Sequence, residues 1–125
     1  MVLLLVRALP PARLSALVEA TLAMGMAPVV EAANADEVAV ALETRATIVG
    51  VNARDLRSFQ VDTSAPQQAL ASIPDDRIAV HMSGIHTRAD FMAVADGRAD
   101  AVLIGESLMR AAQPAEQLQK LLGTL

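Results

Sequence analysis

Polar side chains and glycines that could bind a small anion follow the short apolar runs of this 125-residue chain. They are a carboxylate at Glu31, an amide and a cation at Asn52 and Arg54, and glycine turns at 83–85 and 105–107. Glycine lets backbone N–H groups approach an anion closely, and a helix N-terminus adds partial positive charge. Arg54 could close such a site with a forked, charge-assisted contact. The combination predicts a site for a small phosphorylated ligand.

Five apolar runs are expected to carry these residues at their ends. The runs cover residues 3–6, 28–31, 47–51, 78–81 and 101–104. Each run is continuous rather than alternating, which is typical of parallel strands covered on both faces. In parallel α/β folds the ligand site lies where strands end and helices begin. We therefore expect the candidate residues to meet at one edge of a sheet.

Helix signals fill the segments between the runs. Asn34 with Glu37, and Thr87 with Asp90, have the spacing of a capping box. Paired prolines suit a helix start, and glycines suit helix ends. The predicted helices begin near residues 11, 35 and 88 and cover 63–72 and 114–122, with stops at Gly25, Gly97 and Gly123.

The alternation predicts an α/β fold with five βα units in one domain spanning residues 1–125. Two architectures fit: a partial TIM barrel, that is a (βα)5 half-barrel with parallel strands, or a flattened flavodoxin-like sheet of five strands. A complete barrel needs about 200 residues or more, so this chain cannot form one alone.

Composition excludes several classes of protein. The chain is 54% hydrophobic with a net charge of −4 and no cysteine, which excludes intrinsic disorder, a disulfide framework and a thiolate metal site. Acidity and an aromatic content of 2% argue against nucleic-acid binding. The apolar start is too short for a membrane span or a secretory signal. We expect a soluble cytoplasmic protein without a metal or cofactor.

Four segments resemble a known enzyme family. VVEA (29–32), VGVNARDL (49–56), MSGIHTRAD (82–90) and AVLIGESLMR (101–110) are similar to consecutive strand-end motifs of indole-3-glycerol phosphate synthase, a TIM barrel of tryptophan biosynthesis. The resemblance covers essentially the whole chain and runs from the family's fourth strand to its eighth helix. It implies a lyase that closes an indole ring on a phosphorylated, anthranilate-derived ribulose, with loss of carbon dioxide and water.

The resemblance implies catalytic roles at two positions. Glu31 matches the family's fifth-strand catalytic carboxylate, and Asn52 matches an amide that contacts the substrate. Two residues depart from the pattern. The family usually has a polar residue where Ala53 stands and a glutamate where Met82 stands, so Met82 removes a carboxylate from the pocket wall.

The resemblance also implies a phosphate-binding set. Arg54 matches a cation that contacts the phosphate, and Ser83 resembles a substrate-binding hydroxyl. Gly84 and Gly105, together with the backbone of Glu106, resemble the phosphate cradle. The implied ligand is indole-3-glycerol phosphate or its ribulose phosphate precursor.

Each candidate also has a plainer interpretation. Glu31 could be a solvated carboxylate, Arg54 could pair with a nearby aspartate, and the glycines could serve only as turns. His81 follows an apolar run, where a core or interface histidine is favoured over a catalytic one.

The family's first-strand and third-strand lysines have no counterpart, because Lys120 in the terminal helix is the chain's one lysine. We therefore expect a half-barrel that keeps the phosphate-binding half of the site and is inactive alone. One alternative is a subunit that becomes active when another chain supplies the N-terminal strands. The other is a structural fragment that self-associates without a ligand.

An incomplete barrel would expose the edges of its first and last strands and the inner face of its sheet. A homodimer that buries these surfaces is the simplest arrangement we expect.

Overall fold

Five parallel strands form one sheet in the computed structural model, which describes residues 1–53 and 64–124. They pair in the order of the sequence, and all neighbours are parallel. The strands are β1 (Val2–Leu5), β2 (Pro28–Ala32), β3 (Ile48–Asn52), β4 (Ile78–Met82) and β5 (Ala101–Leu103). Each lies within one residue of its predicted bounds at either end, because the apolar runs mark the strands closely.

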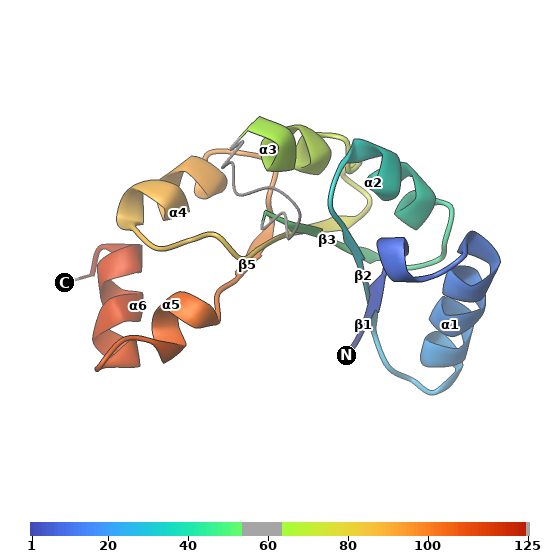
Figure 1. Ribbon diagram of the computed structural model, residues 1–125, viewed down its shortest axis with the longest axis horizontal. Coiled ribbons are helices and arrows are strands. Elements are labelled where there is room, and N and C mark those ends of the chain that lie inside the picture. The colour runs from blue at the N-terminus through green and yellow to red at the C-terminus, as the bar shows by residue number, and fades with distance from the viewer. Residues whose placement is uncertain (54–63, 125) are drawn as a thin grey trace.

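The helices form an outer arc around the strands (Figure 1). They are α1 (Pro11–Ala23), α2 (Ala35–Leu42), α3 (Ser64–Ala71), α4 (Arg88–Ala95), α5 (Glu106–Met109) and α6 (Pro114–Leu122), with the 3-10 turn η1 (Val6–Ala8) after β1. A flavodoxin-like sheet would reverse its strand order at one point and carry helices on both faces. The ordered strands and one-sided helices therefore confirm the partial TIM barrel, and the sheet is not closed.

The predicted helix ends are largely confirmed by side-chain contacts. Asn34 Oδ1 accepts a hydrogen bond from the Glu37 amide at 2.9 Å. Glu37 in turn accepts from the amide of residue 33 instead of residue 34, so this cap differs by one residue from a capping box. Thr87 and Asp90 form a full capping box, and Gly123 ends α6 with φ +73°. The short helix α5 carried no signal that the sequence analysis used.

The main core lies between the sheet and its helices. Alternate strand residues point to the helices and are fully buried, among them Val30, Val49 and Val51. The opposite, concave face is open: Leu3, Ile78 and Leu103 are about half exposed, at 48%, 47% and 55%. The expectation of strands covered on both faces is therefore wrong for the concave face, whose partners in a closed barrel would be further strands.

Arg98 joins two loops at the amino ends of β4 and β5, away from the ends that carry the candidate residues. Its guanidinium donates to the carbonyls of Ile73, Pro74 and Arg77 at 2.9–3.1 Å and to the Asp100 carboxylate at 2.7 Å. Asp100 also accepts from the Ala79 amide at 2.8 Å, and these two donors hold the pKa of its carboxyl below the usual value. Arg98 thereby ties three carbonyls of the 73–77 segment to Asp100 at the start of β5.

Replacing Arg98 with alanine should lower the free energy of unfolding by about 2–3 kcal/mol, because charge-assisted bonds to several carbonyls are lost together. Urea unfolding followed by circular dichroism measures the change. Arg45→Ala is the matched control, since its ion pair with Glu19 is exposed and should contribute less than about 0.5 kcal/mol. Equal effects of the two substitutions would contradict the role given to Arg98.

Candidate ligand site at the carboxyl ends of the strands

Three candidate side chains form one hydrogen-bonded chain across neighbouring strands. Asn52 Nδ2 donates to Glu31 Oε1 at 3.1 Å, and Ser83 Oγ donates to Asn52 Oδ1 at 2.6 Å. Glu31 lies near the end of β2, Asn52 ends β3, and Ser83 follows β4. The predicted meeting of these residues at the carboxyl edge is therefore confirmed by their contacts.

Strand register explains why these side chains reach one another. Glu31 is aligned with Gly50, and Asn52 is aligned with Met82. Residues two apart on a strand share a face, so Glu31, Gly50, Asn52 and Met82 all point to the concave side. Because Gly50 has no side chain, nothing on its own strand separates the Asn52 amide from the Glu31 carboxylate.

The turn after β4 has an unusual backbone conformation. Ser83 has φ +64° and Gly84 has φ +76°, the left-handed region that L side chains rarely adopt. The Ser83 amide donates to the Leu103 carbonyl at 3.2 Å, and its hydroxyl is engaged by Asn52. A non-glycine residue held in this region costs of order 1–3 kcal/mol and tends to occur at binding sites.

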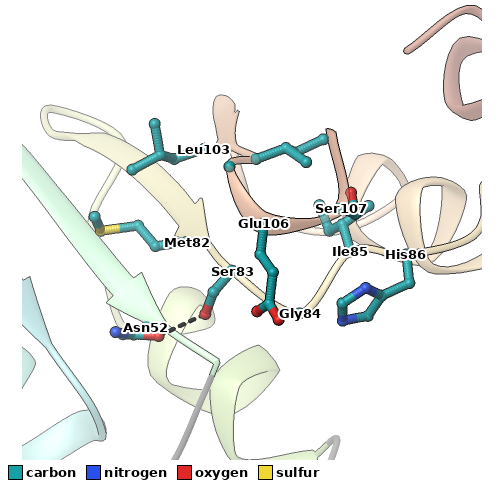
Figure 2. Close-up of a pocket in the computed structure, with 11 residues that line it drawn as sticks. Asn52, Met82, Ser83, Gly84, Ile85, His86, Leu103, Glu106 and Ser107 are labelled. Atoms are coloured by element: carbon teal, nitrogen blue, oxygen red, sulfur yellow. Dashed lines mark hydrogen bonds between the residues drawn. The ribbon is translucent and has the colours of Figure 1, made fainter. Parts of the chain in front are cut away.

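A cavity of about 360 Å³ opens beside this turn. It lies between the ends of β3, β4 and β5 and the start of α5 (Figure 2). Its lining comprises Asn52, Met82, Ser83, Gly84, Ile85, His86, Leu103, Ile104, Gly105, Glu106 and Ser107.

Several polar groups of the lining are not engaged by the described part of the chain. The backbone amides of Gly84 and Gly105 find no acceptor among residues 1–53 and 64–124. The buried hydroxyl of Ser107 has no hydrogen-bond partner within the same residues. Such groups are ready to donate to an anionic ligand. The Glu106 carboxylate pairs with Arg110 at 3.0 Å and extends toward Gly84 (Figure 2).

Comparisons with known proteins show the family of the chain. The family model "Indole-3-glycerol phosphate synthase" matches residues 1–121. This chain belongs to that family. It is 43% identical over 121 residues to "Indole-3-glycerol phosphate synthase 2" of Streptomyces coelicolor, covering 97% of this chain and 47% of the relative. It is 41% identical to the "Multifunctional tryptophan biosynthesis protein" of Schizosaccharomyces pombe, covering 97% of this chain and 16% of that protein.

The chain spans about half the length of the synthase relatives that it matches. A solved structure described as "Native KDPGal structure" superposes with a TM-score of 0.64 at 21% identity, over 92% of this chain and 64% of that one. At this identity the likeness shows the fold alone, and it agrees with the parallel α/β arrangement.

The structure brings most of the candidates of this synthase-family chain to one place. Asn52, Ser83, Gly84, Gly105 and Glu106 line the cavity. Glu31 is not part of the lining and is linked to it through Asn52. Arg54 lies outside the described residues.

Sequence analysis missed the apolar part of the lining and one imidazole. Leu103, Ile85 and Ile104 looked like ordinary strand or loop residues, and His86 carried no case of its own. The sequence carries no signal for Leu103, because Ala101–Leu103 is apolar throughout; its place on the concave face follows from its alignment with Met82. No group of three or more potential metal ligands occurs among the described residues, and none of their helices is long and apolar enough to cross a membrane.

His81 lies outside the cavity and belongs to the core. It is 6% exposed and is aligned with Val51 and Val102, whose side chains face the helices. Burial lowers the pKa of its imidazole from the ordinary 6.5, and a backbone hydrogen bond with Ser83 partly opposes this shift. The interpretation of His81 as a core histidine agrees with this burial, but a satisfied one was expected, and its Nδ1 has no hydrogen-bond partner among the described residues.

The lowered pKa of His81 makes stability depend on pH. Well above pH 6.5 the imidazole is neutral in both states, whereas near and below pH 6.5 the unfolded chain binds the proton more readily than the folded one. The free energy of unfolding should therefore fall as pH drops from 7.5 to 5.5. Urea unfolding at three pH values measures this. His81→Gln should remove much of the slope, and the exposed control His86→Gln should retain it. An unchanged slope in His81→Gln would contradict this account.

Proposed function

We propose that this chain binds a small phosphorylated ligand of the indole-3-glycerol phosphate type and does not by itself catalyse ring closure. One observation carries the proposal. The turns after β4 and β5 converge on a cavity where the Gly84 and Gly105 amides have no acceptor in the described part of the chain. The family's match over residues 1–121 supports a phosphorylated ligand. A cytoplasmic location is part of the proposal.

The phosphate is held by backbone N–H groups and a hydroxyl in this proposal. Gly84 lets the phosphate approach its amide closely because it has no side chain. Its φ of +76° is also one that L side chains rarely adopt. Ser107, whose buried hydroxyl has no partner in the described part of the chain, supplies the hydroxyl, and Gly105 supplies the amide of the facing turn. Arg54, by resemblance, adds the cation that completes charge neutralisation.

The catalytic half of the chemistry is incomplete in this chain. Decarboxylative ring closure needs a proton donor and a cation near the carbonyl that is attacked. Glu31 offers a carboxylate oriented by Asn52, which suits stabilisation of positive charge or removal of a proton. The one lysine, Lys120, lies on α6 and is not among the residues that line the cavity. The lysine acid that the resemblance implies therefore has no counterpart in this cavity.

Titration of the full chain with indole-3-glycerol phosphate, followed by amide chemical shifts, tests the binding. We expect saturable shifts at Ser83, Gly84 and Gly105. Gly84→Ala should weaken binding roughly tenfold, because a side chain at positive φ is strained and its Cβ would lie 3.4 Å from the Ala53 Cβ. Gly97→Ala is the matched control, at a glycine outside the cavity. Arg54→Ala should also weaken binding.

Two outcomes would contradict the proposal. A flat titration of the folded chain would remove the binding function and leave a structural fragment. Formation of indole-3-glycerol phosphate from the anthranilate-derived ribulose phosphate by the chain alone would remove the claim of inactivity.

The open sheet supports a second, oligomeric aspect of the proposal. Leu3, Ile78 and Leu103 on the concave face are about half exposed, which is unusual for apolar residues on the face of a sheet. Edge strands β1 and β5 and the apolar concave face are the surfaces that a second copy would cover. A chain that supplies three further strands is the alternative occupant.

Sedimentation velocity at several concentrations tests the homodimer. We expect a dimer that dissociates in Ile78→Lys, since a charge on the half-exposed concave face would be buried in the interface. Met24→Lys should leave the dimer intact, because Met24 is the exposed C-cap residue of α1 and does not lie on the concave face. A monomer at all concentrations would overturn the homodimer and favour a partner that supplies the remaining strands.

A further inference from the structure

The Met82 side chain covers Gly50 on the concave face. A Cβ added to Gly50 would collide with Met82 Sδ, which lies over the glycine, and would lie 3.3 Å from Met82 Cγ. Met82 is consequently only 5% exposed, although Leu103 beside it in the same row is 55% exposed. The thioether fills the space that a side chain at position 50 would take and forms a floor at one end of the cavity.

The cavity is apolar on the side of this floor. Met82 and Leu103 make up this part of the lining, whereas Ile85 lies at the other end of the cavity beside Ser107 and His86 (Figure 2). Figure 2 shows Met82 and Leu103 on the strands, with Ser83 and Gly84 on the turn that follows. A ligand whose phosphate lies at Gly84 would therefore place its remaining atoms against hydrocarbon and sulfur.

We infer that Met82, which lies over Gly50, sets the ligand preference of this site. Phosphate monoesters whose remaining atoms are apolar or aromatic bind more tightly than those whose remaining atoms carry several hydroxyl groups. The inference rests on the proposed function, because it needs the phosphate to bind at the glycine turns. A hydroxyl placed against the Met82 thioether loses hydrogen bonds to water and regains at most a weak one. An aromatic ring gains apolar burial and a favourable contact with sulfur.

Paired titrations of the full chain with phenyl phosphate and glycerol 3-phosphate test this selection. Both probes are phosphate monoesters, so the ratio of their dissociation constants reports the contribution of the atoms outside the phosphate group. We expect phenyl phosphate to bind at least tenfold more tightly, and Met82→Gln to reduce that ratio to about twofold or less. Met92→Gln, the same substitution on α4 outside the cavity, should leave the ratio unchanged.

Gly50→Ala provides a second variant that keeps Met82. The added methyl group would displace the Met82 thioether from Gly50 into the cavity. Phenyl phosphate should then bind more weakly, and its advantage over glycerol 3-phosphate should fall. Met82→Leu should keep the preference, because its side chain remains apolar. Circular dichroism establishes that each variant is folded.

The outcomes separate this inference from the proposed function. Equal affinity for both probes would overturn the selection and leave the phosphate site standing. A preference that persists in both Met82→Gln and Gly50→Ala would show that another residue sets it and would also overturn the inference. No saturable shift with either probe would overturn the phosphate site and, with it, the selection.

Discussion

Parallel pairing of strands in sequence order is the constraint on which the site depends. In such a sheet, aligned residues share a face and all carboxyl ends lie at one edge. The alignments of Glu31 with Gly50 and of Asn52 with Met82 follow from this pairing. A shift of one residue between β2 and β3 would turn Asn52 toward the helices and break its bond to Glu31. The polar chain and the cavity floor therefore share one structural origin.

The amino and carboxyl ends of the strands have different roles. At the amino ends, Arg98 and Asp100 satisfy loop carbonyls and amides with short charge-assisted bonds. At the carboxyl ends, the turn at Ser83 and Gly84 keeps a strained backbone, and some amides there have no acceptor in the described part of the chain. This division is common in parallel α/β proteins, where ligand-binding turns tolerate local strain because the opposite edge is firmly bonded.

Much of the fold could be predicted from the sequence, because local signals carried it. Continuous apolar runs marked the strands, and the capping pair of Thr87 and Asp90 marked the start of α4. Strand order and curvature were beyond such signals, since both architectures use the same βα units. Only pairing between distant segments distinguishes them.

The candidate site was predicted in part for a similar reason. Motifs located Asn52, Ser83 and the glycine turns, but the link from Glu31 through Asn52 to Ser83 depends on register. Met82 was noted as a lost carboxylate, yet its position over Gly50 is a contact between two strands that composition cannot show. Arg54 lies in 54–63, outside the described residues, so its role still rests on resemblance.

The placement of one cavity wall on β5 has a consequence for local dynamics. With three residues, β5 is the shortest strand in the described part of the chain, where it is paired on one side, to β4. Short edge strands open with lower free energy than central ones, so their amides exchange with solvent sooner. A ligand that bridges the turns after β4 and β5 stabilises the closed arrangement by mass action. Slower hydrogen exchange along β5 would thus report occupancy of the cavity, even where the central strands register no change.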